Sequence, residues 1–410
     1  MLVGAAVAVL LLLAGWWAMQ HWLGSDDFRL RAERAATEAV GVPVRLGRIG
    51  LDLLPVPGLA LEAVRIETRP VATIGRVELR AVLGVLLQGR LELSSLQLQQ
   101  VDASQAGWEY LAAQRSKRPP VPAGGPLLPW AQRLRVDGLT WRPVSGTPAT
   151  VDADATLAPD GLPDTLQARV RSGPLQGADL ALTRKGLAWA VRAKYAGGTV
   201  RGELTLDRLP APGGVVQLDG RLVTEGVDVG VLSGQRLSGR LGATTTLGLR
   251  TGGAGALMDS LQTQSQLRVR DAVVHGVDLA RAVRTVGLSR GGETRLDALA
   301  GQVSTRGRAV QLSNLVASSG LLTASGQLSV SASRALRGRV QVQVGPAVVG
   351  RALGVPLVVG GTLDDPELTL TRSAMLGAAI GTLVLPGVGT GAGAALGDKI
   401  GNSIQGIFGK

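Results

Sequence analysis

Many short segments of the sequence alternate apolar and polar residues, and this period of two constrains the fold more than any other feature. Clear examples are RVELRAV (76–82), TVRGELTLD (199–207), SQLRVRD (265–271) and GRVQVQVG (338–345). A β-strand turns successive side chains to opposite faces, so each segment predicts a strand with one apolar face. Gly, Asp, Asn or Pro separates most of these segments, which is typical of antiparallel strands joined by short turns. The chain is therefore expected to be mostly β.

Two local signals add detail to this pattern. Ser94–Ser95 shifts the phase between RLEL (90–93) and LQLQ (96–99), which predicts a β-bulge. FRLRAERAATEAVG (28–41) has the Ala, Glu and Arg content of a short helix, and Gly41 is a typical helix end.

The apolar faces of these strands are almost purely aliphatic, because aromatic residues make up only 3% of the chain. A one-sided strand must cover its apolar face with another layer. Two arrangements are open: two sheets that close on each other, or one curled sheet whose aliphatic groove accepts acyl chains. Composition alone favours the closed sandwich.

The N-terminal segment predicts a membrane anchor. Residues 2–23, from Leu2 onward, contain no Asp, Glu, Lys or Arg, and 22 helical residues reach about 33 Å, enough to cross a bilayer core. Trp16, Trp17 and Trp22 cluster at one end, where indole rings favour the membrane interface. The run ends without a small-x-small cleavage site, which favours an uncleaved anchor over a signal peptide. The arginines that follow the span leave its orientation open.

The other boundaries follow from composition. The segment RSKRPPVPAGGP (115–126) predicts a linker between an N-terminal helix and β region (25–114) and a longer β region (127–372). Residues 374–397 carry no charge and contain several G-x-x-x-G spacings, interrupted by Pro386–Gly387. The segment 373–410 is therefore predicted to form a short helical hairpin that enters a membrane or caps a groove. A plain packing element explains it equally well.

Composition also excludes several kinds of function. The absence of Cys excludes disulfides, thiolate zinc sites and a cysteine nucleophile. The net charge is +12, but the arginines are spread singly and lack interleaved aromatics, which argues against nucleic acid as a partner. His275, between Asp271 and Asp278, is more typical of a polar side chain on the surface than of a catalytic base. We assign no catalytic residue, metal ligand or cofactor, and expect a protein that is not an enzyme.

Four stretches resemble the AsmA family. They are residues 32–66, residues 74–101 with the apolar turn at Leu86, Leu87 and Gly89, RVRDAVVHGVDL (268–279) and PLVVGGTLDDPELTL (356–370). The resemblance implies an N-terminal helix in the bacterial inner membrane and a body in the periplasm that forms an elongated, taco-like β-sheet with a hydrophobic groove. The wider group, which includes TamB-like proteins, is implicated in phospholipid transport toward the outer membrane and in outer-membrane biogenesis.

The leading hypothesis is therefore a non-enzymatic, inner-membrane protein that binds or transfers phospholipid through an aliphatic groove. The alternative is a scaffold that assists outer-membrane protein assembly through an exposed sheet edge and has no lipid cavity. A third possibility is an envelope adaptor with a closed sandwich. The partners expected are phospholipid, the inner membrane, and outer-membrane or envelope proteins. The residues predicted to line the groove are Val77, Leu79, Leu91, Leu93, Leu204, Leu206, Leu267, Val269, Val310, Leu312, Val340, Val342, Leu368 and Leu370.

Overall fold

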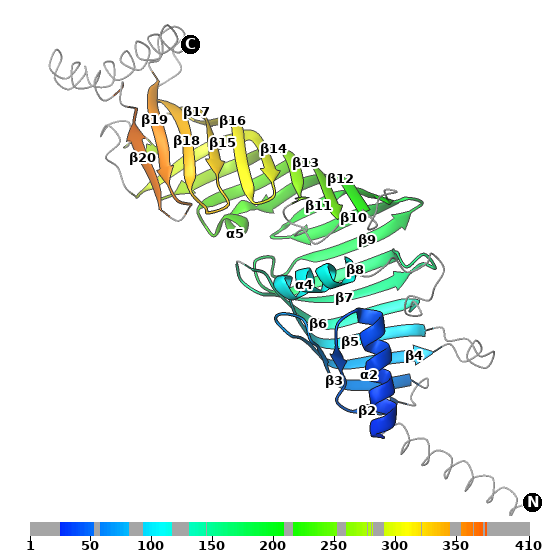
Figure 1. Cartoon of the computed structure of the whole chain (residues 1–410). Helices are drawn as coiled ribbons and strands as arrows, with labels where there is room; N and C mark the ends of the chain where they lie inside the picture. Colours follow the sequence, from blue (N-terminus) through cyan, green and yellow to red (C-terminus); the bar gives the residue numbers. More distant parts are fainter. Residues whose placement is uncertain are drawn as a thin grey trace, which may run out of the picture. The chain divides into compact units, whose positions relative to one another are not determined.

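The computed structural model is mostly β. It describes residues 25–52, 58–81, 93–116, 131–144, 146–208, 216–251, 260–276, 278–279, 281, 291–320, 322–344, 354–363, 365–371 and 374. Twenty strands belong to one large sheet that does not close on itself, and helices are few (Figure 1). The prediction of a mostly β chain is confirmed.

Contacts divide the chain into two compact units. Unit 1 is residues 1–193 with 208–216 and 252–256, and unit 2 is residues 194–207, 217–251 and 257–410. The linker predicted over 115–126 stays a prediction. Arg115 and Ser116 form the end of a helix, and the rest of that predicted linker lies outside the described residues.

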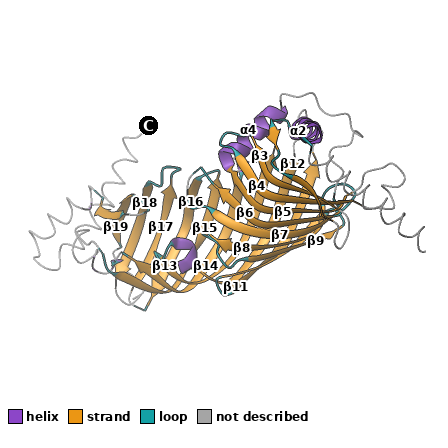
Figure 2. Ribbon diagram, turned by 90° about the horizontal axis from the view of Figure 1, so that it is seen from below, coloured by secondary structure: helices purple, strands orange, loops and turns teal. Residues whose placement is uncertain are grey.

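Unit 1 is a sheet with two helices on one side of it (Figures 1 and 2). Strands β1 and β2 both pair with β3, and from β3 to β9 each strand pairs with the next. The elements are α2 (Asp26–Val40), β1 (Val44–Arg45), β2 (Ile49–Asp52), β3 (Gly58–Ile66), β4 (Ala72–Ala81), β5 (Leu93–Ser104), α4 (Gln105–Ser116), β6 (Arg133–Arg142), β7 (Ala149–Leu157), β8 (Pro163–Ser172), β9 (Asp179–Lys185) and β10 (Ala188–Tyr195), which extends to the unit boundary.

The prediction of an antiparallel sheet is wrong at one pair. Strands β5 and β6 run parallel, with Leu96 opposite Leu134. A two-residue hairpin can join only antiparallel strands, so a parallel pair needs a longer crossover connection. Helix α4 lies in that connection. The sheet is therefore mixed.

Helix α2 confirms the helix predicted over 28–41. The Ser25 side chain accepts a hydrogen bond from the Phe28 N–H at the first turn, and Gly41 ends the helix with φ 97°. Only a residue without a Cβ adopts such a φ at low cost, and the Gly41 N–H donates to Thr37 O. One stripe of the helix packs on the apolar face of β1–β5; the stripe consists of Phe28, Ala32, Ala36 and Val40.

Unit 2 continues as an antiparallel meander, in which every strand from β13 to β20 pairs with the next. The elements are β11 (Gly198–Arg208), β12 (Val216–Asp228), α5 (Val229–Ser233), β13 (Leu237–Thr251), β14 (Gln262–His275), β15 (Glu293–Arg306), β16 (Ala309–Ser319), β17 (Leu322–Val330), β18 (Leu336–Val344), β19 (Val355–Gly361) and β20 (Pro366–Leu370).

The bulge predicted at Ser94–Ser95 is confirmed. The register between β4 and β5 shifts between Arg80 and Ala81, so that Arg80 lies opposite Ser95 and Ala81 opposite Leu93. The shift returns Leu93 to the same face as Leu96, because residues opposite each other in a ladder share a face.

Within the part of the chain that the structure describes, we find no helix with the length and apolar character needed to cross a membrane. The predicted anchor, with Leu2, Trp16, Trp17 and Trp22, lies outside the described residues. The predicted C-terminal hairpin (373–410) also lies outside them, except for Ala374.

Candidate functional site

The apolar face of unit 2 is the candidate site. Cross-strand register aligns its aliphatic side chains into rows that run from strand to strand. The first row consists of Leu241, Val269, Leu299, Ala317, Ala324, Val342 and Val355. A parallel row consists of Ser265, Val303, Leu312, Leu328, Gly338, Val359 and Leu368. A third row lies between them and includes Leu267, Gly326, Val340, Leu357 and Leu370.

Burial differs sharply between the rows. In the first row Val269 is 1% exposed and Val342 is fully buried. That row belongs to a cluster that includes Val229 of the short helix α5. In the parallel row Val303, Leu312 and Leu328 are only partly buried. The apolar face is therefore tightly packed along one side and partly exposed along the other.

Glycines on this face allow neighbouring strands to approach closely. A Cβ on Gly338 would lie 2.3 Å from Gln327 O and 2.5 Å from Leu328 Cδ2. A Cβ on Gly326 would lie 2.3 Å from Arg339 O. No side chain fits at such distances, so these two positions require glycine where β17 and β18 pair.

Unit 1 carries a comparable apolar face. One row crosses seven strands and consists of Leu59, Leu79, Leu96, Leu134, Ala155, Leu166 and Leu182. Helix α2 covers this face at β3–β5. On β6, β8 and β9, beyond the helix, Leu134, Leu166 and Leu182 are partly exposed.

The groove residues predicted from the sequence fall on these two apolar faces. Val77, Leu79 and Leu93 lie on the face of unit 1, where Val77 and Leu93 are buried. In unit 2, a Cβ on Gly220 would meet both Leu204 and Leu247, which places Leu204 and, by alternation, Leu206 on the apolar face. Leu91 lies outside the described residues. The remaining predicted residues also lie on the face of unit 2: Leu267, Val269, Val310, Leu312, Val340, Val342, Leu368 and Leu370.

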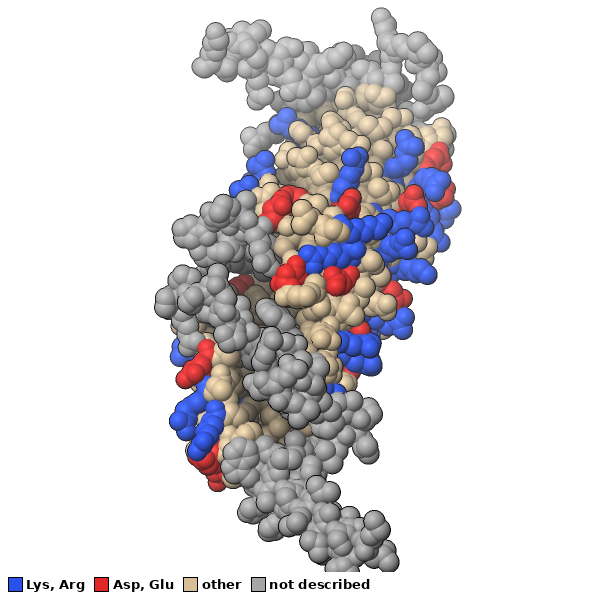
Figure 3. Space-filling model, turned by 90° about the vertical axis from the view of Figure 1, so that its right-hand side faces the viewer, with Lys and Arg blue, Asp and Glu red and all other residues tan. Residues whose placement is uncertain are grey.

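The opposite, polar face of unit 1 pairs its arginines with carboxylates. Arg133 Nη2 lies 2.9 Å from Asp154 Oδ2, and Arg169 Nε lies 2.6 Å from Asp179 Oδ1. The hydrogen bond from Arg133 to Asp154 raises the pKa of that guanidinium above its ordinary value. Figure 3 shows Lys and Arg interspersed with Asp and Glu on the side drawn.

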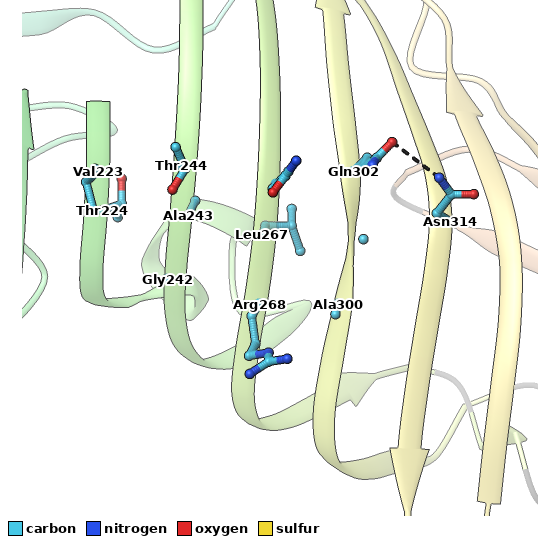
Figure 4. Close-up of a pocket in the computed structure, with 12 residues that line it drawn as sticks. Val223, Thr224, Gly242, Ala243, Thr244, Leu267, Arg268, Ala300, Gln302 and Asn314 are labelled. Carbon is cyan, nitrogen blue, oxygen red and sulfur yellow. Dashed lines mark hydrogen bonds between the residues drawn. The ribbon is translucent and has the colours of Figure 1, made fainter. Parts of the chain in front are cut away.

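The polar face of unit 2 is different, because two arginines of β14 there have no carboxylate opposite them in the register. Arg268 lies between Gly242 and Ala300, and Arg270 lies between Arg240 and Ala298. A shallow recess of about 500 Å³ lies beside them and is lined by Thr244, Gln266, Arg268, Gln302 and Asn314, among others (Figure 4). Asn314 Nδ2 donates to Gln302 Oε1 at 3.3 Å, so two of the lining amides satisfy each other.

Sequence analysis missed one polar cluster. His275 Nε2 lies 3.1 Å from Ser238 Oγ, and His275 Nδ1 lies 2.9 Å from Glu293 Oε1. Three strands bring these residues together, since His275 lies directly opposite Glu293 and Ser238 lies opposite Val273. The sequence places Asp271 and Asp278 nearest to His275, so no local spacing points to Glu293.

This cluster has the order of a hydroxyl nucleophile, a base and an orienting carboxylate. The His275 side chain is 34% exposed and that of Glu293 is 52% exposed. Water therefore competes for both polar contacts, unlike the buried carboxylate of an efficient triad.

Comparison with known proteins gives no relative. No family model, no curated protein and no solved structure matches this chain.

Proposed function

We propose that this protein binds the acyl chains of phospholipid along the apolar face of its sheet and transfers the phospholipid within the cell envelope. The observation that carries the proposal is the row through Val303, Leu312 and Leu328, which is aliphatic, continuous across strands and partly exposed in a sheet that is not closed. An exposed aliphatic surface of this length is unfavourable in water unless a ligand or partner covers it.

The chemistry of the face suits acyl chains. Its side chains are mostly Leu, Val and Ala, which offer no hydrogen bond that would fix a ligand at one position. Each methylene transferred from water to such a surface contributes about 0.8 kcal/mol. Binding of this kind is non-directional, so a chain can slide along the rows while its headgroup stays in water.

The family resemblance gives the proposal its cellular setting. It implies an anchor in the inner membrane, a body in the periplasm and movement of phospholipid toward the outer membrane. A scaffold that assists outer-membrane protein assembly is the second candidate. In its favour, β20 has only five residues and pairs with β19, with no second partner among the described strands. A free sheet edge can accept a strand from another chain.

Two neighbouring residues of β18 provide the test. Val340 is partly buried on the apolar face opposite Leu357, whereas Gln341 is exposed on the polar face. We would purify the full chain in detergent and quantify co-purified phospholipid by mass spectrometry for the wild type, Val340→Asp and Gln341→Asp. Both variants add one negative charge to the same strand.

If the proposal is correct, Val340→Asp loses lipid relative to the wild type, and Gln341→Asp does not. Lipid bound only around the anchor is common to all three proteins and cancels in the comparison. Equal lipid content in all three would reject the groove and favour the scaffold. Val342 is a poorer position for this test, because it is fully buried and a charge there would unfold the sheet.

A further inference from the structure

The charge balance of the chain changes within β15 and keeps one sign through β18. Residues 298–344 contain five arginines (Arg306, Arg308, Arg334, Arg337 and Arg339) and no Asp or Glu. Unit 1, by contrast, places a carboxylate beside many of its arginines. A segment whose charged residues all carry one sign favours a positive potential at the surface, which an anionic ligand can neutralise.

A recess lies at the strand ends of this region. Its volume is about 560 Å³. Arg306 of β15 and Arg337 of β18 both line it and come from strands that are separated by β16 and β17. The other lining residues are short or uncharged: Ser304, Ala309, Val310, Gln311, Ser329, Val330, Ser331, Ser333 and Ala335.

Register places part of this lining in one row on the polar face. Ser304 lies opposite Gln311, Gln311 opposite Ser329, and Ser329 opposite Arg337. Arg306 lies two positions further along its strand pair, opposite Ala309. The side chains of Arg306 and Arg337 therefore flank a row of uncharged side chains.

The loop at the edge of the recess is held by its own hydrogen bonds. Ser331 Oγ lies 2.8 Å from Ser333 Oγ and accepts a hydrogen bond from the Ala335 N–H at 3.1 Å. Ser329 Oγ donates to Arg337 O at 3.1 Å, which ties β17 to β18 beneath the guanidinium. These contacts fix the positions of the hydroxyl groups before any ligand arrives.

We propose that this recess binds a phosphate group. A phosphate offers several acceptor oxygens and more than one negative charge, which matches two guanidinium groups and the one hydroxyl proton that the Ser331–Ser333 pair can still donate. Neither guanidinium has a carboxylate opposite it in the described register. A single carboxylate ligand would leave much of this donor set unused.

The phosphate can belong to a free phosphate ester or to a phospholipid headgroup. The row that carries Arg337 lies on the polar face, opposite the aliphatic rows, whereas Val310 and Val330, which also line the recess, belong to the apolar face. The proposal rests on the two arginines and does not depend on acyl-chain binding.

The experiment is calorimetric titration of the full chain in detergent. The probes are inorganic phosphate, glycerol 3-phosphate and a short-chain phosphatidic acid. The test variant is Arg306→Gln/Arg337→Gln. The control is Arg268→Gln/Arg270→Gln, which removes the same charge from β14, outside the recess.

We expect saturable binding of at least one probe by the wild type. The test variant should weaken it by about tenfold or more, because each guanidinium contributes a charged hydrogen bond. The control variant should change affinity by only about twofold. Binding of all three probes identifies the phosphate itself as the ligand, and binding of phosphatidic acid alone identifies a lipid headgroup.

Two results would overturn the proposal: no saturable binding of any probe, or an equal loss in both double variants, which would mean that net charge alone attracts anions. Val340→Asp separates this proposal from the proposed function. It removes an aliphatic contact on the opposite face, so phosphate binding should survive in it whether or not lipid is lost.

Discussion

The backbone N–H of Leu46 donates to the Glu33 Oε1 atom at 2.8 Å, which ties helix α2 to the edge of the unit 1 sheet. A second bond acts beside it, from the Val44 N–H to Thr37 Oγ1 at 3.0 Å. Both donors belong to buried residues at the short edge strand, where no other strand that the structure describes accepts them. The helix therefore supplies acceptors that a further strand would otherwise supply.

Replacing Glu33 by Ala should destabilise unit 1 by about 1–3 kcal/mol, since the Leu46 N–H would lose its acceptor and has little access to water. The change is measurable as a lower midpoint of urea unfolding. Glu33→Gln keeps an acceptor oxygen at the same place and should stay close to the wild type. If Ala and Gln at this position were equally stable, the bond to Leu46 would contribute nothing.

Replacing Gly338 by Ala should lower stability by roughly 1–3 kcal/mol, because the new methyl group overlaps Gln327 O and Leu328. The matched control is Gly360→Ala on β19, where a Cβ has no atom within 4 Å. Thermal unfolding of the two variants measures the difference. Equal melting temperatures would show that the β17–β18 pair can separate enough to admit a side chain.

Leu→Ala substitutions on the apolar face should distinguish residues that stabilise the fold from residues that contact bound lipid. Leu357 is fully buried, so Leu357→Ala should cost about 2–5 kcal/mol. Leu312 is partly exposed, so Leu312→Ala should cost clearly less and act mainly on bound lipid. Urea unfolding with lipid extraction on the same samples measures both effects. A similar stability loss at Leu312 would make that row part of a closed core.

The Ser238–His275–Glu293 cluster should not act as a hydrolytic site. We expect no labelling of Ser238 by a fluorophosphonate probe, because exposure of Glu293 and His275 lets water compete for the contacts that would activate the hydroxyl. A serine hydrolase labelled in parallel confirms that the probe is active. Stoichiometric labelling that disappears in both Ser238→Ala and His275→Ala would contradict this and identify an enzyme.

Sequence reasoning identified the strands of unit 2 well, because alternation is a local property. Leu312 and Val340 were predicted on one face from period two alone, and register later placed them on the same face. Helix α4 was missed, since the segment from Gln105 to Ser116 was read as the end of a β region that runs into a linker. Its middle carries no clear apolar stripe, and Trp108 is 53% exposed.

Other features depend on pairing between distant segments, and no local pattern encodes them. The parallel partnership of β5 with β6 follows from the path of the chain after α4. The contact between His275 and Glu293 follows from the register of two long strands, and the recess between Arg306 and Arg337 needs four strands in place. None of these three contacts can be predicted until it is known which strands are neighbours.

The parallel pair has a consequence for how the protein folds. From β13 to β20 each pair joins strands that are adjacent in the chain, so unit 2 can grow by adding one hairpin at a time with little loss of chain entropy. Unit 1 must also bring Leu96 beside Leu134, across the whole connection that contains α4. We expect that closure to be the slow step of unit 1, and unit 2 to reach its native pairing without waiting for it.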